Sequence, residues 1–553
     1  MRSSMSLLPV VTNCALTLLL TAGAGTCATG SSASALLEGD GRSALLQWLS
    51  ESSFRFCLTP GAGSCSAHAV SVAEQPTPSR QDTTEAYGFR TKFLAVTVEK
   101  RSLRLRVAAA SGEVLVDDLR AVEFPGGDIV VERSAGESER FFGLGARPSS
   151  PLNIRRTRVK ATTPFLLSSS GYGLHHSGPG AYTFGLADVE PGRYRIFIDH
   201  SPALDFFFYY GPSPKEILEE HKRAVGAPAM LKTWQAGVIH RKQLPTGAVA
   251  LADPAEGSWE SLHASTRAMV NASMSAIAIP AFDLTPYLAA PTPLFRRATQ
   301  LGAVSPVVFL ENMAVLLEPD KLDAFQLMTE RRKQLQSHLL TYATEATTRG
   351  LPMLHPLPLQ FPKDAEAAKW DDIFMLGDEV LVAPVWSESG RRQVYLPMGF
   401  WTDLATNEVH RGRQTIEFEA PEDRIPMFVK NGSILPLDPK TERDPVTLHY
   451  IPRLAAEFFL YEPELGEYSQ LHAGPVGESM RLEIESLKSR MYEWVVHHVA
   501  EAREVTIGEI AVPRVAEAAR LRPKSWYYDK KRGDLRVRVE AVKGGDSIVY
   551  LHF

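Results

Sequence analysis

Hydrophobic and polar residues alternate along this chain in two rhythms. Residues 93–99 (FLAVTVE) and 103–107 (LRLRV) alternate in part between apolar and polar positions, which is typical of half-buried β-strands. Runs rich in aromatic and β-branched residues at 194–198 and 204–210 also suit a pleated surface. Many short strands separated by turn residues predict a β-sandwich in the N-terminal part of the chain.

From about residue 234 to 361 the spacing of apolar residues changes, and short apolar runs alternate with segments of helical periodicity. The apolar run 248–252 is followed by a helix that Ser258 would cap at its N-terminus. A second apolar run at 277–279 and a later helix from about Arg331 continue the alternation. This order of strand, helix and strand predicts parallel strands covered by helices.

From about residue 375 to residue 553 short strands dominate again. Residues 381–383 and 428–430 are apolar runs bounded by Gly, Pro, Asn and Asp, and residues 534–539 alternate regularly. We interpret this part as two small β domains with a boundary near Pro452. The fold class predicted for the whole chain is therefore multidomain, α/β plus all-β.

Composition and charge narrow the class of protein. At roughly 150 residues per domain, 553 residues suffice for about three or four domains. The hydrophobic share of 44% and the charged share of 22% are those of packed globular proteins. The net charge of −5 gives no electrostatic reason to expect a nucleic acid as partner.

The N-terminal end of the chain differs from the rest. Arg2 precedes a short apolar run at 15–20, and small residues with two A-x-A sites follow between Ala22 and Ala35. This order predicts a cleaved signal peptide and a secreted or lumenal protein. The alternative is a membrane anchor, but Asn13 interrupts an apolar stretch that is already too short to span a bilayer.

The cysteines point to the same compartment. Of the four, Cys14 would leave with the signal peptide and Cys27 lies near the cleavage region. Cys57 and Cys65 are close in sequence, and an oxidising compartment would allow them to pair. We predict neither a metal at these cysteines nor another cofactor.

Several short motifs occur in one order along the chain. FFGLG at 141–145 lies in the predicted β-sandwich, and YGPSPKEI at 210–217 precedes the α/β region. FMLGDEVLVAPV at 374–385 follows that region, and the stretch 425–436 ends in GSILP. Together with the order of the domains, these motifs resemble glycoside hydrolase family 31, the α-glucosidase and α-xylosidase family. The resemblance covers nearly everything after about residue 85.

The resemblance implies an activity and a partner. Family members hydrolyse the O-glycosyl bonds of α-glucosides or α-xylosides by a retaining mechanism, so an α-linked oligosaccharide or glycoside is the expected partner. Retaining enzymes need two carboxyl groups about 5–5.5 Å apart, one as nucleophile and one as acid/base. No cofactor is implied, and no oligomeric state is predicted.

The expected catalytic barrel is short in this chain. Residues 234–364 number only 131, whereas a complete (β/α)8 barrel takes about 250 residues and rarely fewer than 200. The family's nucleophile is an Asp in a W-x-D-M-x-E-like strand end, and no such motif stands between Gly237 and Asp253. We therefore expect an incomplete barrel that lacks several βα units and the nucleophile.

These observations divide the chain into five expected segments. They are a signal peptide with its leader, an N-terminal β-sandwich, a truncated (β/α) barrel, a proximal C-terminal β domain and a distal C-terminal β domain. The two C-terminal domains are expected to be β-sandwiches. The corresponding ranges are 1–35, 36–228, 229–365, 366–451 and 452–553.

Two aspartates are the first candidates for site residues. Asp253 and Asp283 each follow an apolar run and are separated by one helix, which would put both at the carboxyl edge of a parallel sheet. The resemblance implies that Asp253 is the acid/base residue and that Asp283 lines the sugar site. The alternative for Asp253 is a loop residue beside the turn at Pro254.

Two further residues complete the candidate site. Arg297 matches the family's R-W-x-Q pattern, although Ala298 replaces the Trp, and the resemblance implies a role in sugar binding. In the family the next strand ends with an Arg and a sugar-binding His, where this chain has Phe309 and Glu311. Glu311 would add a third carboxylate at the sheet edge.

Three hypotheses about function follow. The first is an α-glycoside hydrolase that is impaired or inactive because its nucleophile is absent. The second is a non-catalytic carbohydrate-binding pseudoenzyme or scaffold built from the retained β domains. The third is a truncated gene product that folds poorly, because a broken barrel exposes strand edges and apolar helix faces.

Overall fold

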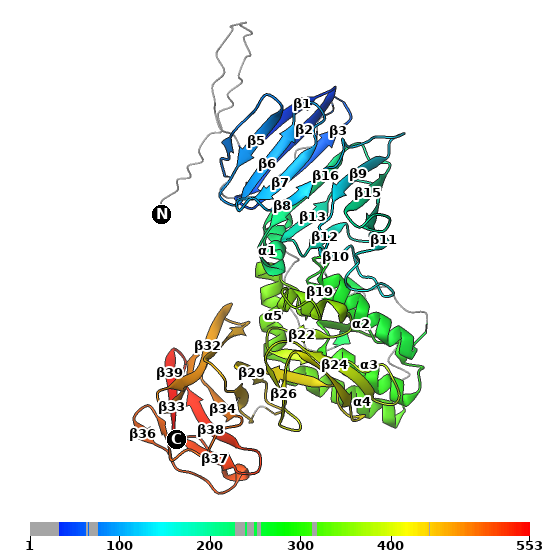
Figure 1. Ribbon diagram of the computed structural model, residues 1–553. Coiled ribbons are helices and arrows are strands. Elements are labelled where there is room, and N and C mark those ends of the chain that lie inside the picture. The colour runs from blue at the N-terminus through cyan, green and yellow to red at the C-terminus, as the bar shows by residue number, and fades with distance from the viewer. Residues whose placement is uncertain are drawn as a thin grey trace, which may run out of the picture.

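The protein is rich in β-sheet and has few helices. In Figure 1 the N-terminal strands (blue to cyan) lie at one end, and the helices α2, α3, α4 and α5 (green) follow them. The last strands (orange to red) lie beyond these helices. The computed structural model describes residues 33–553 except for 62, 64, 66–75, 227–237, 240–247, 251–255, 312–317 and 442.

Three sheets form the N-terminal part and share one core. The strands predicted from alternation are confirmed at Leu94–Glu99 and Leu105–Ala109, and those predicted from aromatic and β-branched residues at Arg193–Asp199 and Leu204–Tyr210. Buried aromatic and aliphatic side chains of all three sheets pack together between the layers. The seven-stranded sheet has the order β1 (Ser34–Gly39), β2 (Arg42–Ser50), β3 (Ser53–Thr59), β16 (Leu204–Tyr210), β13 (Tyr172–His176), β12 (Phe165–Ser168), β10 (Phe141–Gly143). The other two are β11 (Thr157–Lys160), β14 (Ala181–Leu186), β15 (Arg193–Asp199), β9 (Ile129–Ser134), and β4 (Ser79–Arg80), β5 (Ala86–Arg90), β6 (Leu94–Glu99), β7 (Leu105–Ala109), β8 (Val114–Asp117).

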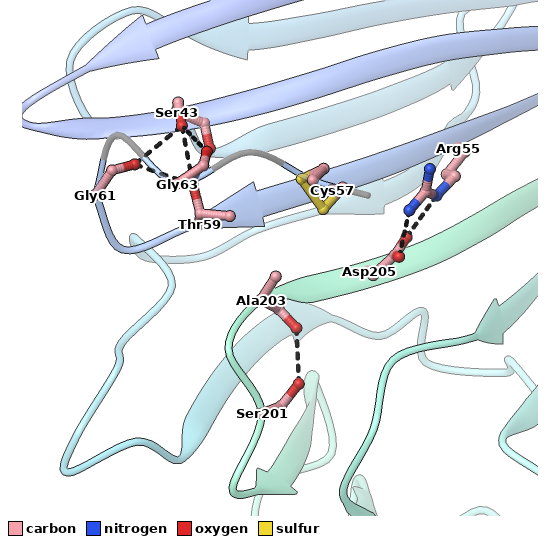
Figure 2. The surroundings of a disulfide bond; sticks show 10 residues. Ser43, Arg55, Cys57, Thr59, Gly61, Gly63, Ser201, Ala203 and Asp205 are labelled. Atoms are coloured by element: carbon pink, nitrogen blue, oxygen red, sulfur yellow. Dashed lines mark hydrogen bonds and ion pairs between the residues drawn. A yellow bond between two sulfur atoms is a disulfide. The ribbon is translucent and has the colours of Figure 1, made fainter. Parts of the chain in front are cut away.

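A disulfide closes the loop after β3. Cys57 and Cys65 are bonded, so the expected pairing is confirmed. Beside it, Arg55 donates from Nε and Nη2 to the two carboxylate oxygens of Asp205 at 2.8 and 2.6 Å, and this ion pair ties β3 to β16 (Figure 2). The hydroxyl of Ser43 donates to the carbonyl of Gly61 at the start of the closed loop. Cys14 and Cys27 lie outside the described residues.

The middle of the chain contains the predicted parallel unit. All three strand pairings of the sheet β17-β20-β19-β18 are parallel. Ser258 caps the helix after β18, accepting a hydrogen bond from the backbone of Ser261, as predicted. Four parallel strands belong to this sheet among the described residues, and its origin in a truncated barrel stays a prediction. The elements are α1 (Pro214–Val225), β17 (Val238–Ile239), β18 (Ala248–Ala250), α2 (Trp259–Ser273), β19 (Ile279–Asp283), η2 (Thr285–Tyr287), α3 (Thr292–Val304), β20 (Val307–Phe309), α4 (Pro319–Gln334), α5 (Gln336–Arg349).

Two local expectations for this region were wrong. The helix predicted from about Arg331 is in fact the end of α4 followed by α5, and Leu335 separates the two. The strand β21 (Leu354–Pro356) falls within the range predicted for the barrel, yet it pairs antiparallel with β22 (Phe374–Leu376). The hydrogen bonds of β21 therefore join it to the first C-terminal sheet rather than to the parallel sheet.

Strands dominate the C-terminal part, as predicted, but their pairing crosses the expected boundary at Pro452. β30 (Val446–Ile451) pairs parallel with β34 (Arg490–Val496), and β29 (Ser433–Leu437) pairs with β30, so both join a sheet that continues to β38. The domain ranges as a whole remain predictions. The four sheets are β21-β22-β23-β28-β25-β26, β24-β27, β29-β30-β34-β38-β37 and β31-β32-β33-β39-β35-β36. Their remaining strands are β23 (Val380–Val382), β24 (Arg391–Leu396), β25 (Phe400–Asp403), β26 (Glu408–Arg411), β27 (Gln414–Glu419), β28 (Met427–Lys430), β31 (Ala456–Glu462), β32 (Glu467–Val476), β33 (Ser479–Ser486), β35 (Glu504–Ile507), β36 (Ile510–Ala511), β37 (Ser525–Asp529), β38 (Asp534–Ala541), β39 (Gly545–His552); the short helix α6 (Leu357–Gln360) follows β21.

Within the part of the chain that the structure describes, no helix has both the length and the apolar character needed to cross a membrane. The predicted signal peptide falls almost entirely on residues 1–32, which are outside the described residues. The first strand, β1, begins at Ser34, and its residue Ala35 pairs with Leu46 of β2.

Candidate functional site

Asp283 and Glu311 lie at the carboxyl edge of the parallel sheet. Asp283 is the last residue of β19 and stands in register with Phe309, the last residue of β20. Its Oδ1 accepts a hydrogen bond from the backbone N–H of Thr285 at 2.8 Å, which forms the turn after the strand. The hydroxyl of Thr285 accepts in turn from the backbone N–H of Glu311 at 2.9 Å. Thr285 thus connects the two residues that the sequence predicted for this edge.

Asp253, the predicted acid/base residue, lies outside the described residues. The strand that precedes it, β18, pairs parallel with β19, and Ala250 stands in register with Ala281. The strands leading toward Asp253 and Asp283 are therefore neighbours in one parallel sheet. The catalytic role of Asp253 stays a prediction.

Arg297 forms hydrogen bonds within the fold, and its predicted sugar-binding role stays a prediction. Its side chain is only 4% exposed. The guanidinium donates to Gln300 Oε1 at 3.0 Å and to the carbonyls of Ala420, Pro421 and Arg424 at 2.9, 2.9 and 3.2 Å. Burial lowers the pKa of Arg297. These bonds fasten α3 to the segment between β27 and β28.

A pair of adjacent carboxyl groups, of which Glu379 is buried and Asp378 is half-exposed, was not predicted. The hydroxyl of Tyr342, on α5, donates to Glu379 at 2.8 Å and accepts from the backbone N–H of Asp378 at 2.9 Å. Lys215 Nζ lies 2.8 Å and His355 Nδ1 lies 3.0 Å from Asp378 Oδ1. The network therefore joins α1, α5, β21 and the turn between β22 and β23. The signal in the sequence was the acidic pair GDE inside the apolar run FMLGDEVLVAPV.

The two carboxyl groups of this pair have opposite pKa shifts. Burial, reinforced by the charge of Asp378, raises the pKa of Glu379 to about 8. Burial opposes ionisation of Asp378 too, but the hydrogen bond and charge of His355 and the charge of Lys215 hold the pKa of that carboxyl well below its usual range. Glu379 is thus protonated at neutral pH and Asp378 is ionised. Since Glu379 is 8% exposed and bonded within the protein, we assign the pair to the fold.

A second cluster has ligand types that suit a metal ion. His263, Asp371 and Asp372 bring one possible ligand atom each within 4.8 Å of one another. Each carboxylate already has a guanidinium partner, however, with Arg267 2.8 Å from Asp371 and Arg392 3.2 Å from Asp372. Two cations therefore balance the two carboxylates, and we interpret the cluster as an ion-pair network that ties α2 to the first C-terminal sheet.

Comparison with known proteins finds a family model and several enzymes that parts of the chain resemble. Residues 350–435 match the glycosyl hydrolase family 31 C-terminal domain. Alpha-glucosidase 2 of Bacillus thermoamyloliquefaciens is 29% identical over 279 residues, covering 45% of this chain and 35% of that protein. The chain is a relative of the family 31 glycosyl hydrolases. The isomaltosyltransferase of Sporosarcina globispora is 28% identical to this chain over 203 residues, which cover 33% of this chain and 19% of that protein.

Solved structures show the same fold. The GH31 dextranase of Flavobacterium johnsoniae, solved with glucose, gives a TM-score of 0.82 at 16% identity, covering 95% of the family 31 relative and 99% of that chain. The cycloalternan-forming enzyme of Listeria monocytogenes, solved with a pentasaccharide substrate, gives 0.80 at 16% identity, covering 95% and 76%. The sequence matches are shorter, and they cover between about a fifth and a third of the two curated relatives named above.

Proposed function

We propose that this family 31 relative binds α-linked glucosides or xylosides at the carboxyl edge of β18, β19 and β20, and hydrolyses them more slowly than complete family members. The observation that carries the proposal is the pairing of Asp283 and Glu311 at that edge through Thr285. Carboxylates accept hydrogen bonds from sugar hydroxyl groups, and ligand sites of parallel α/β sheets lie at this edge. The family match supports carbohydrate as the ligand.

The reduced rate follows from the chemistry that retention requires. Asp253 would serve as acid/base residue, and a second carboxylate would have to form the glycosyl ester from the opposite face of the sugar. No counterpart of the family's nucleophile stands between Gly237 and Asp253. Asp283 would have to take its place, yet its Oδ1 already accepts from the backbone of Thr285. A displacement of about 1 Å can lower a rate by roughly 10²-fold.

Sugar binding is expected to be weak for a related reason. The guanidinium of Arg297 donates its hydrogen bonds to carbonyls inside the protein. Phe309, which stands where the family has a polar residue, is fully buried and belongs to the apolar core. The described edge therefore offers the sugar mainly hydrogen-bond acceptors. Binding without hydrolysis, and the truncated gene product, are the alternatives that the experiment below separates.

The test uses the purified full chain with aryl α-glucosides and α-xylosides, and calorimetry with isomaltotriose. We expect slow hydrolysis that Asp253→Asn abolishes, and isomaltotriose binding that Asp283→Asn weakens by about tenfold, since a hydrogen-bonded charged acceptor is lost. Glu388→Gln, at an exposed position of the C-terminal part, is the control and should change neither.

Each contrary result has a definite meaning. Hydrolysis as fast as that of a complete family member would overturn the proposal that the activity is impaired. Isomaltotriose binding with no hydrolysis would favour the carbohydrate-binding pseudoenzyme. Neither binding nor hydrolysis by a folded sample would refute the carbohydrate site, and an unfolded sample would favour the truncated product.

We also propose that the protein is secreted or lumenal. The order of charge, apolar run and small residues in the first 35 residues supports this location. The bond between Cys57 and Cys65 supports it independently, because such bonds persist in oxidising compartments.

A further inference from the structure

A cavity of about 590 Å³ lies between helices α3 and α4 and the strands β28, β29 and β30. Its apolar lining includes Val304 from α3, Leu327 and Met328 from α4, and Leu435 from β29, and several charged side chains line it as well. The volume falls within the range of about 300–1,000 Å³ typical of small-molecule sites. Neither Asp283 nor Glu311 lines it, so the cavity is separate from the carboxylate edge.

The wall formed by β30 contains His449, which leads into a buried chain of polar groups. Nδ1 of His449 lies 3.0 Å from Nε2 of His497, and Nδ1 of His497 lies 3.1 Å from Oδ1 of Asp534. Arg532 donates from Nε to the other oxygen of Asp534 at 2.9 Å. His497 and Asp534 are 2% and 1% exposed, so this chain holds the His449 ring from the side away from the cavity.

The direction of these hydrogen bonds decides what His449 offers to the cavity. Burial opposes ionisation of Asp534, but the bonds from His497 and Arg532 hold its pKa at about 2, so it acts only as an acceptor. With Asp534 as acceptor, Nδ1 of His497 is the donor of that bond, and a ring that carries one proton accepts at Nε2. Burial, with the neighbouring His497, lowers the pKa of His449 to about 3, so His449 is neutral and donates from Nδ1.

Nε2 of His449 is consequently a lone-pair acceptor. It has no hydrogen-bond partner among the residues that the structure describes. Two of the charged side chains that line the cavity, Asp403 and Arg424, pair with each other at 2.9 Å.

We propose that the cavity binds an apolar small molecule with one hydroxyl group, and that this hydroxyl donates to Nε2 of His449. The aliphatic lining would bind the apolar body by removing it from water. The acceptor would favour ligands with a hydroxyl group. An apolar molecule without a donor would displace water from Nε2 and leave it without a hydrogen bond. The proposal is independent of the carbohydrate site.

The test is calorimetry of the purified full chain at pH 8 with 2-naphthol and with 2-methoxynaphthalene, which has the same ring system but no donor. We expect 2-naphthol to bind about tenfold more tightly. Leu327→Trp fills the cavity and should weaken binding of 2-naphthol at least tenfold. Leu322→Trp, on the same helix at an exposed position outside the lining, is the matched control and should not.

His449→Phe keeps a ring but removes the acceptor, and should bring the two affinities within about threefold. Circular dichroism checks that this variant folds, and the comparison of the two probes on the unaltered chain decides the proposal if it does not. Equal affinities for the two probes would overturn the proposal. So would no binding up to the solubility limit, or a Leu327→Trp variant that binds like the unaltered chain.

Discussion

Asp378 and Glu379 are adjacent in sequence, yet their carboxyl groups meet opposite environments. Asp378 faces the cationic Lys215 and has Nδ1 of His355 3.0 Å from its Oδ1, whereas Glu379 faces the hydroxyl of Tyr342 in a buried site. The first carboxyl is therefore stabilised as an anion and the second as a neutral acid. At the residue scale, burial and neighbours decide the chemistry, because the two side chains differ by only one methylene.

Glu379 should make the stability of the protein fall as pH rises. Its pKa is about 8 in the folded protein and 4.5 before folding, so the folded state holds one more proton between these values. The free energy of unfolding should then fall by up to about 1.4 kcal/mol per pH unit from pH 4.5 to 8. Glu379→Gln cannot titrate and should remove this slope.

Urea denaturation at pH 5, 6.5 and 8 measures the effect. Glu388→Gln, at an exposed position, is the control and should keep the slope of the unaltered chain. The lowered pKa of Asp378 acts in a separate window: its stabilisation is present above pH 3.8 and is lost as pH falls further. An equal slope in Glu379→Gln and the unaltered chain would refute the assignment.

At the scale of elements, single side chains connect segments far apart in the sequence. Arg297 of α3 bonds the carbonyls of the segment between β27 and β28, more than 120 residues away. The hydrogen-bond networks around Glu379 and around Asp371 and Asp372 likewise join helices of the middle region to the first C-terminal sheet. The Arg297 bonds hold α3, which follows β19 in the chain and precedes β20, against this C-terminal segment.

Arg297→Met should destabilise the protein by about 2–4 kcal/mol, because it leaves buried carbonyls without donors. Arg296→Met is the matched control on the same helix. Arg296 is partly exposed and pairs with the exposed Glu422 at 3.6 Å, so its loss should cost less than about 0.5 kcal/mol. Thermal and urea denaturation of the two variants measure the difference. Equal losses of stability in the two variants would show that the hydrogen bonds of Arg297 do not stabilise the fold as described.

At the scale of the whole molecule, the location of the protein and its N-terminal strand are linked. β1 begins at Ser34, and Ser34 and Ala35 pair with Gln47 and Leu46 of β2. Cleavage before Ser34 would leave this pairing intact, whereas cleavage after Ala35 would remove two paired residues. The structure thus favours the earlier part of the interval that the A-x-A sites define.

We expect the exported protein to begin between Gly25 and Ser34. Mass spectrometry of material purified from the medium or the lumen would measure the terminus, and the same spectrum under non-reducing conditions would report the Cys57–Cys65 bond. Exported protein that retains Met1 would refute cleavage. A protein that keeps both thiols free in its own compartment would count against the oxidising location.

The local sequence determined most of the elements. Alternating positions predicted β6 and β7 because one face of each strand is buried and the other is not, and aromatic and β-branched residues predicted β15. Ser258 predicted the start of α2 because its side chain satisfies a free backbone N–H in the first turn. The motif order pointed to the family whose C-terminal domain residues 350–435 match. The ends of two apolar runs predicted that Asp253 and Asp283 share one sheet edge, with Glu311 as a third carboxylate.

Only the tertiary structure decided which side chains and which strands contact one another. Arg297 and Asp283 both matched family positions, but long-range packing gave the first to backbone carbonyls and left the second at the sheet edge. β21 pairs antiparallel with β22, and β30 pairs parallel with β34. Both pairings likewise depended on which strands met in space. Periodicity reports which side of an element is buried and does not report what covers it. The polar chain from Asp534 to His449 was invisible in sequence for that reason, because its three residues are 37 and 48 positions apart and meet only in the folded protein.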